Sequence, residues 1–174
     1  IQRSDLAITE IESKDRKQNP YPPFITSTLQ LDASNKLGFS HSRTMSLAQN
    51  LYEGININGK NTGLITYMRT DSVNLSNEAR NGAKVTIESD FGIKYSKPRN
   101  FKGNSKGAQE AHEAIRPTDF SRHSVHVDKD QDRLYDLIWK RAIASQMSEA
   151  ELETKIAAST DPAIGGLSSA EHAR

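Results

Sequence analysis

The chain has 174 residues, enough for one hydrophobic core of ordinary size, and its 23 basic and 22 acidic residues give a formal net charge of +1. This charge neither requires nor excludes a nucleic-acid partner, so local charge has to decide. The absence of cysteine excludes disulfides and thiolate zinc sites, and no apolar run approaches the ~20 residues of a membrane-spanning helix.

The N-terminal residues predict an extended segment. Residues 5–12 alternate weakly between apolar and polar side chains, as an edge strand does, and a charged stretch then leads to the three prolines of residues 20–23. Because proline fixes φ and lacks a backbone donor, we expect residues 1–22 to form an extended connector or a strand of a neighbouring domain. The chain opens on Ile1 without a methionine, so we expect a piece of a longer polypeptide.

Residues 23–148 predict one domain that is mainly α with a small β hairpin. Ser27 or Thr28 can cap a helix that runs to Lys36, and Ser40 or Ser42 can cap a second helix that closes at Gly54. An Asn-Gly pair within residues 55–62 then favours a hairpin. A helix pair followed by a hairpin is typical of a winged-helix-like fold, although many helix pairs only pack a core.

The second half of this domain predicts a strand and further helices. Residues 63–69 are the strongest strand prediction, and a helix capped by Ser76 should run to Asp90. Residues 109–115 favour one or two helical turns, and residues 130–147 favour the longest helix.

The C-terminal residues look different from this domain. Residues 161–174 are small and polar, which predicts a tail that packs poorly. We expect residues 149–174 to be either a disordered tail or the start of a neighbouring domain.

One pair of side chains in the predicted strand could carry chemistry. Strand alternation would place Tyr67 and Arg69 on one face. Tyrosine, with a pKa of about 10, is a poor nucleophile near neutral pH, but a neighbouring cation favours the phenolate and can bind a phosphate. On this pattern alone, a half-buried strand tyrosine beside a solvated arginine is the simpler interpretation.

The surrounding strings change that interpretation. Residues 63–72, Gly-Leu-Ile-Thr-Tyr-Met-Arg-Thr-Asp-Ser, resemble the active-site signature of type IA DNA topoisomerases, and residues 109–118, Gln-Glu-Ala-His-Glu-Ala-Ile-Arg-Pro-Thr, resemble the histidine motif of that family. Further matches lie in residues 23–30 and 48–54, and in residues 137–139 together with 146–147. The histidine-motif string is most similar to that of the bacterial type I members.

The resemblance implies a role for each motif residue. Tyr67 would attack the phosphodiester and Arg69 would support the phosphate, while His112 and Thr70 would bind the phosphate. Arg116 is a further phosphate-binding candidate, but Pro117 after it disfavours a helical conformation and favours a role in organising the motif.

Other cations are candidate DNA contacts, but the sequence alone leaves them open. Arg43 lies at the start of the second predicted helix, and five cations follow in an acid-free stretch with interleaved aromatic residues: Lys94, Lys97, Arg99, Lys102 and Lys106. A solvated loop explains this stretch equally well.

No metal site is expected in this chain. Arg116 stands where a zinc-binding helix would need a second histidine after His112, and Asp128, Asp130 and Asp132 look like acids at a helix start. The resemblance implies Mg²⁺ in the full-length enzyme, bound by a domain that this chain lacks.

The expected function is therefore that of one part of an ATP-independent topoisomerase. Such an enzyme cleaves one DNA strand through a transient 5′-phosphotyrosine link, passes a strand and reseals, which relaxes negative supercoils. We expect single-stranded DNA and the remaining domains of the same polypeptide as partners, no membrane contact, a cytoplasmic, nucleoid-associated location in a bacterium, and no activity of the fragment alone. A winged-helix DNA-binding module without catalysis, or a scaffold domain, are the alternatives, and neither explains the tyrosine and histidine strings.

Overall fold

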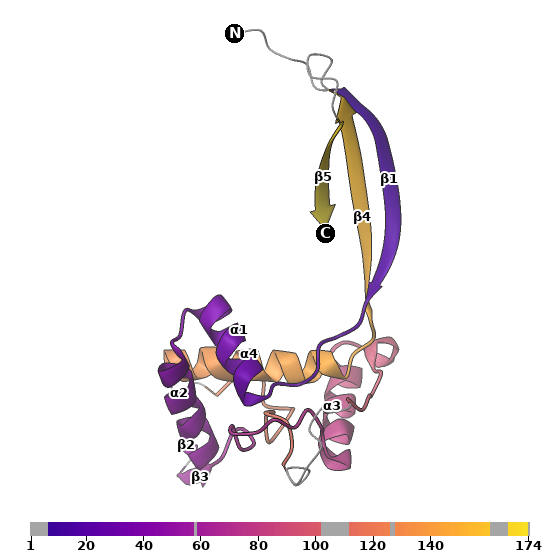
Figure 1. Cartoon of the computed structure of the whole chain (residues 1–174). Coiled ribbons are helices and arrows are strands. Elements are labelled where there is room, and N and C mark those ends of the chain that lie inside the picture. Colours follow the sequence, from indigo (N-terminus) through magenta and orange to yellow (C-terminus); the bar gives the residue numbers. More distant parts are fainter. Residues whose placement is uncertain (1–6, 58, 102–111, 126–127, 161–166, 174) are drawn as a thin grey trace. The chain divides into compact units, whose positions relative to one another are not determined.

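The computed structural model describes residues 7–57, 59–101, 112–125, 128–160 and 167–173. It divides into two compact units, one made of residues 1–19 and 149–174 and the other of residues 20–148. Figure 1 shows the elements of both units.

The first unit is a three-stranded antiparallel sheet. It contains β1 (Ala7–Gln18), β4 (Ala150–Thr160) and β5 (Leu167–Ala173), in the order β1-β4-β5 (Figure 1). The register places Gln18 opposite Ala150, where the two long strands begin to pair.

Strand β1 is longer than the sequence predicted, because it includes the charged stretch expected to lie in a connector. Residues 12–17 are all exposed, so their charges stay in water while the backbone pairs with β4. Side chains also pair across the two strands: the Ser13 hydroxyl donates to Glu153 over 2.7 Å, and Lys17 lies 3.5 Å from Glu151. Residues Leu167–Ala173, which lie in the stretch predicted to pack poorly, form β5 and pair antiparallel with β4.

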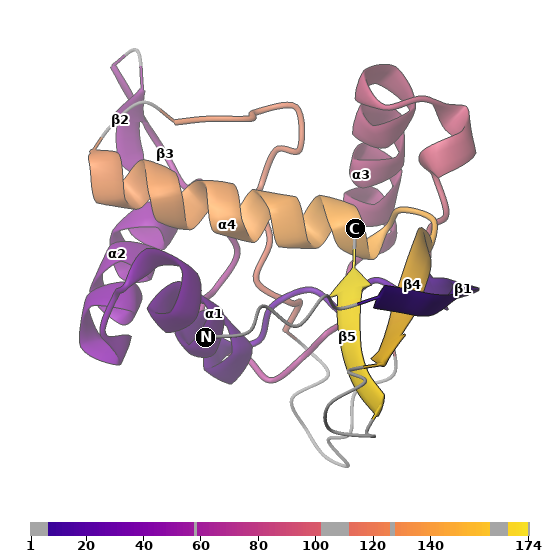
Figure 2. The same ribbon diagram turned by 90° about the horizontal axis from the view of Figure 1, so that it is seen from above.

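The second unit is mainly α with one small two-stranded antiparallel sheet, which confirms the predicted class of this domain. Its elements are α1 (Thr26–Leu37), α2 (His41–Glu53), β2 (Ile55–Ile57), β3 (Lys60–Thr62), α3 (Asn77–Asp90), η1 (Ile93–Tyr95) and α4 (Lys129–Ser145). Helix α4 packs against α1, α2 and α3, with α2 and α3 at its opposite ends (Figure 2). Among the described residues, no helix is long and apolar enough to cross a membrane.

Local side-chain chemistry explains where these helices begin. The Ser40 hydroxyl accepts from the backbone of Arg43, and the Ser76 hydroxyl accepts from the backbone of Ala79, as the sequence predicted. Helix α1 begins before the predicted caps, because Thr28 reaches back and its hydroxyl accepts from the Ile25 N–H over 3.1 Å.

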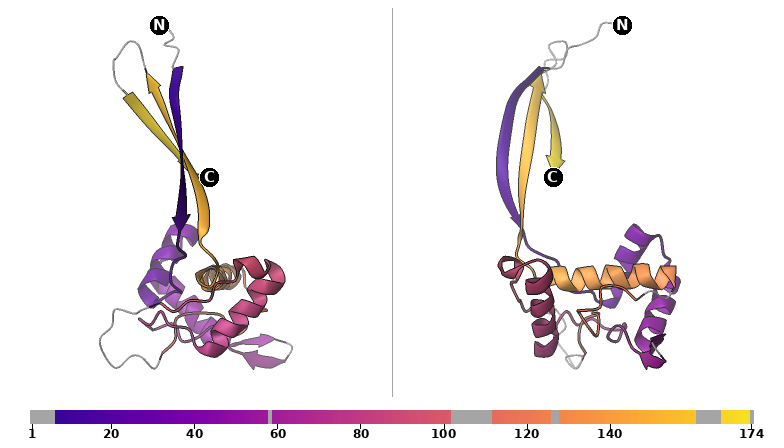
Figure 3. Two further views of the ribbon diagram at one scale, coloured as in Figure 1. Left: turned by 90° about the vertical axis from the view of Figure 1, so that its right-hand side faces the viewer. Right: turned by 180° about the vertical axis from the view of Figure 1, so that it is seen from behind.

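The chain leaves the core at the end of α2 to form the hairpin β2–β3 and then returns to the same place. The Leu64 N–H donates to the carbonyl of Leu51 over 2.8 Å, so the chain returns to the end of α2 directly after the hairpin. Figure 3 shows the hairpin projecting from the helical body. Gly63 permits this return, since a Cβ there would lie 2.9 Å from the Tyr52 carbonyl oxygen.

The predicted strand is wrong, and so is the described part of the predicted helical turns. Residues 63–69 form no strand beyond an isolated bridge between Ile65 and Pro117, and residues 112–115 are extended instead of helical, with a bridge between Ile115 and Phe24. Residues 109–111 lie outside the described residues. Each segment finds its backbone partners in a remote part of the chain, so neither needs a helix or a sheet of its own.

Candidate active site

Burial along residues 64–69 does not alternate as it would in a strand. Leu64, Ile65 and Met68 are each 1% exposed, Tyr67 packs half-buried against the core, and Arg69 is exposed. Tyr67 and Arg69 therefore do not share one strand face with Ile65, because the chain bends at Met68 and Arg69. The bend anchors the segment through Met68 and leaves Arg69 in solvent.

A threonine hydroxyl holds the residue immediately before Tyr67. Thr66 donates through its hydroxyl to the Ala114 carbonyl over 2.7 Å and accepts from the Arg116 N–H over 3.0 Å. The backbone of Thr66 also donates to the Arg116 carbonyl over 2.9 Å. This contact joins the tyrosine string to the histidine motif.

A second threonine holds the residues after Tyr67. Thr26, the first residue of α1, donates through its hydroxyl to the Met68 carbonyl over 2.8 Å and accepts from the Thr70 N–H over 2.9 Å. Tyr67 therefore lies between two threonine contacts. Sequence reasoning missed both residues, although each stands inside a string that carried the family resemblance.

Two rings flank the side chain of Tyr67. The Tyr52 ring meets it edge-on with centroids 5.4 Å apart, and the His112 ring lies at 5.7 Å with a tilt of 40°. The structure thus brings Tyr67 and His112 together. His112 is exposed, so its imidazole is open to solvent beside the phenol.

Arg69 is available to a ligand. Within the described part of the chain its side chain makes no hydrogen bond or ion pair. It borders an open pocket of about 440 Å³ at the start of α1, lined by Ile25, Thr26, Ser27, Gln30, Arg69, Thr70 and Asp71. Thr70 also borders this pocket, but its hydroxyl already accepts from the Ser72 N–H over 3.1 Å.

Arg116 is engaged inside the protein. Its Nε donates to the Glu113 carboxylate, its Nη1 donates to the Pro117 carbonyl over 2.9 Å, and its side chain is 15% exposed. Partial burial alone would raise the pKa of Glu113, but hydrogen bonds from Arg116 and from Ser76 outweigh it and lower that pKa below the ordinary glutamate value. Since Ser76 caps α3, Glu113 connects the histidine motif to that helix.

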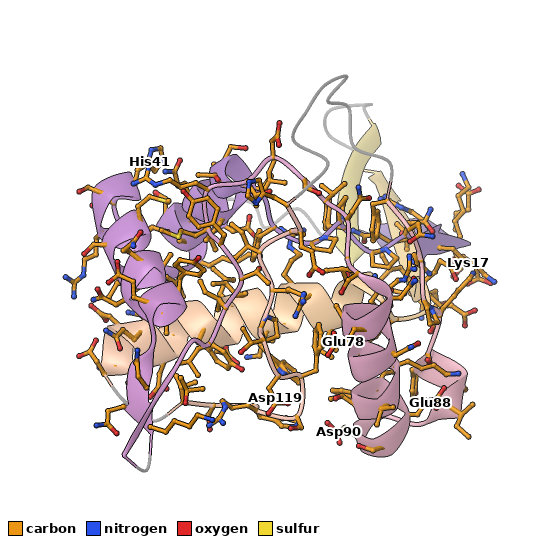
Figure 4. The ribbon with its side chains drawn as sticks, turned by 90° about the horizontal axis from the view of Figure 1, so that it is seen from below. Lys17, His41, Glu78, Glu88, Asp90 and Asp119 are labelled. Carbon is orange, nitrogen blue, oxygen red and sulfur yellow. The ribbon has the colours of Figure 1, made fainter. Side chains whose placement is uncertain are left out.

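Two of the remaining candidate cations, Arg43 and Lys94, have partners within the protein. Arg43 is ion-paired with Asp130 over 2.6 Å, and Figure 4 shows the start of α2, marked by His41, far from α3 with Glu78 and Asp90. Lys94 lies in η1, which contacts α3, and its ammonium is 4.7 Å from the Tyr95 ring centroid.

The rest of the basic stretch is only partly described. The Lys97 and Arg99 N–H groups donate to the backbone and side chain of Gln146, which is fully buried. Both residues have further interactions in the protein. Lys102 and Lys106 lie outside the described residues.

Comparisons with known proteins agree on one family. The model of the DNA topoisomerase family matches residues 1–164. The chain is 50% identical over 161 residues to DNA topoisomerase 1 of Xylella fastidiosa (strain 9a5c), covering 88% of this chain and 20% of that protein. It is 51% identical over 155 residues to the Campylobacter jejuni enzyme of the same name, covering 86% of this chain and 22% of that protein.

A solved structure is also similar. Full-length topoisomerase I from Thermotoga maritima matches 97% of this chain with 38% identity and a TM-score of 0.75, and the match covers 27% of that chain. The chain spans about a fifth of the length of the curated relatives it matches. It therefore belongs to the bacterial type IA DNA topoisomerase family.

Proposed function

We propose that this chain supplies the nucleophile of a topoisomerase that cleaves one DNA strand through a transient 5′-phosphotyrosine link, passes a strand and reseals. The longer protein then relaxes negative supercoils without ATP. The observation that carries this proposal is the position of Tyr67 in a chain of this family: it lies beside His112 and two residues from Arg69, whose side chain makes no hydrogen bond or ion pair among the described residues.

The reaction follows from the groups around Tyr67. The Tyr67 phenol gives up its proton to solvent and its oxygen attacks phosphorus, a new bond forms between that oxygen and phosphorus, and the bond to the 3′ oxygen breaks. The departing 3′ oxygen takes up a proton and becomes a hydroxyl. Arg69 and His112 stabilise the negative charge that grows on the phosphate oxygens, because cations and donors placed there act in the transition state. Reversal of the same step reseals the strand.

The other phosphate candidates have different roles in this proposal. Thr70 helps to hold the loop after Tyr67, and the pair of Arg116 with Glu113 orients His112 by fixing the backbone that follows it. The cations Arg43, Lys94, Lys97, Arg99, Lys102 and Lys106 contribute weaker, sequence-tolerant contacts to single-stranded DNA.

The described residues do not fit the magnesium ion that the family implies. They contain no group of three or more His, Asp or Glu side chains that could hold a metal ion. We derive no step through that ion and assign it to another domain of the longer protein. This chain alone is then expected to form no covalent link to DNA.

The arrangement of α1, α2 and the hairpin β2–β3 supports a winged-helix-like description of this domain. The two helices meet at Gly38, whose φ of 73° suits glycine, and the hairpin follows α2 directly. The same arrangement favours a second candidate function, a DNA-binding module without catalysis. In either case the partners are single-stranded DNA and the other domains of the polypeptide, in the bacterial nucleoid.

A covalent-capture experiment separates the two candidates. A longer protein that includes the neighbouring domains is incubated with Mg²⁺ and with oligonucleotides labelled at either end, and the products are run on a denaturing gel. The strand downstream of the cut should become linked to protein through its 5′ end, and Tyr67→Phe should abolish both this link and relaxation, whereas Tyr21→Phe should change neither. Relaxation by the Tyr67→Phe protein would sink the proposal, and binding without any linked product would favour the non-catalytic module.

A further inference from the structure

The pocket beside Arg69 is large enough for part of a nucleotide. It is an open hollow of about 440 Å³, so a ligand there would be only partly enclosed. Ile25 provides an apolar part of its wall, while Ser27 and Gln30 stand three residues apart on α1 and so lie on one side of that helix.

Three polar side chains at this pocket have no partner in the fold. Within the part of the chain that the structure describes, Ser27, Gln30 and Arg69 make no hydrogen bond or ion pair. The hydroxyl of Thr26, also at the pocket, is used inside the protein. The free groups are therefore those that a bound molecule could engage without breaking a contact of the fold.

The charges at the pocket select the class of ligand. Arg69 is a cation, but the carboxylate of Asp71 also borders the pocket and would repel a phosphate placed inside it. A neutral group with hydrogen-bond donors and acceptors fits better. A nucleobase with its sugar has this chemistry, with the adjoining phosphate outside the pocket on the side of Arg69.

The position along the strand follows from the proposed function, on which this inference rests. In a 5′-phosphotyrosine link, the first nucleotide downstream of the cut stays attached to Tyr67. Arg69 is two residues away, a span of at most about 7 Å of backbone, which is comparable with one nucleotide step of an extended strand.

We infer that this pocket holds the first nucleotide downstream of the cut, with Gln30 and Ser27 bound to its base or sugar. While the strand is open, these contacts keep the 5′ phosphate aligned for attack by the 3′ hydroxyl. Gln30 and Ser27 thereby set the preference for the nucleotide at this position.

The test uses the longer protein and an oligonucleotide that is cleaved at one site. The base is removed either from the first downstream nucleotide or from the second. With the wild-type protein, loss of the first base should raise the KM for covalent-link formation about 2- to 10-fold, the effect of losing one or two hydrogen bonds, and loss of the second base should matter less. Gln30→Ala should raise the KM for the intact oligonucleotide similarly, and removal of the first base should then add nothing. Asn35→Ala, on the same helix outside the pocket, is the matched control.

A second variant fills the pocket instead of emptying it. Ser27→Phe should raise the KM and remove the sensitivity to the first base, whereas Ser34→Phe on the same helix should behave as wild type. Two results would overturn the inference while the covalent link still forms. In the first, removal of the first base leaves the KM of the wild-type protein unchanged. In the second, Gln30→Ala and removal of the first base each raise the KM and their effects multiply. Absence of any 5′-linked product from the wild-type protein would instead overturn the proposed function.

Discussion

The segment that carries Tyr67 and the helices around it lie in one unit but are held by different forces. The helices begin at local caps and bury apolar side chains such as Leu29, Leu51 and Ile138, which have no exposed surface. The segment around Tyr67 has no regular structure and depends on the hydroxyls of Thr26 and Thr66, which bond to groups at least 42 residues away along the chain. Variants of the helices should therefore change stability, and variants of the segment should change chemistry.

The largest effect on stability should come from the helical core. Ile138→Ala in α4 removes a fully buried side chain and should lower the free energy of unfolding by about 2–5 kcal/mol, through lost burial and the cavity left behind. Val85→Ala on α3, where the side chain is 67% exposed, is the matched control and should change it little. Urea unfolding measures both. If folded Ile138→Ala protein cleaved DNA much more slowly than wild type, the claim that helix variants affect stability and segment variants affect chemistry would be wrong.

The largest effect on chemistry after loss of Tyr67 itself should come from the two residues assigned to the reacting phosphate. Arg69→Ala and His112→Ala should each slow cleavage by roughly 100-fold, about 3 kcal/mol, because each removes a group that stabilises charge in the transition state. Affinity for single-stranded DNA should fall much less. Arg80→Ala on α3 controls for the loss of one positive charge. An unchanged cleavage rate in either variant would remove that residue from the site.

A smaller effect is expected when Thr66 loses its hydroxyl but keeps its side-chain volume. Thr66→Val keeps the volume but leaves the Ala114 carbonyl and the Arg116 N–H without this partner, which should cost about 1–3 kcal/mol in unfolding and also slow cleavage. Thr66→Ser should restore both quantities. Thr62→Val in the hairpin, where the hydroxyl donates to the nearby Lys60 carbonyl over 3.3 Å, is the control. Cleavage by Thr66→Val at the wild-type rate would show that this contact does not position Tyr67.

The smallest effect concerns the stability of the Glu113→Gln variant at acidic pH. Because the pKa of Glu113 is lowered in the folded protein, its contribution to stability is present above the ordinary value of 4.5 and is lost as the pH falls through the lower, folded value. Glu113→Gln should therefore lose less stability than wild type between about pH 5 and pH 3. Asp32 and Asp130 also have lowered pKa values, but they are common to both proteins and cancel in the comparison. The free energy of unfolding is measured in urea at each pH for wild type and Glu113→Gln. An equal loss of stability in the two proteins would contradict this account of Glu113.

The sequence predicted features that depend on near neighbours. Ser40 and Ser76 cap the helices expected of them, since the accepting hydroxyl and the donating N–H are three residues apart. It failed for residues 63–69, because a short apolar run has the same pattern in a strand and in an irregular buried segment. It also did not identify the partners of Arg43 and Arg116, which are Asp130 and Glu113.

The sequence by itself determined the helical class of the main unit, the hairpin and the family, because caps, turn residues and motif strings are all written in contiguous residues. Only the tertiary structure decided which side chains surround Tyr67. The rings of Tyr52 and His112 flank its side chain, and the hydroxyls of Thr26 and Thr66 hold the backbone on either side of it, because the chain returns to one place from distant positions, and no local pattern encodes that return. The hydrogen bonds that hold the site link residues 42 to 50 positions apart, so their existence depends on the packing of the whole unit.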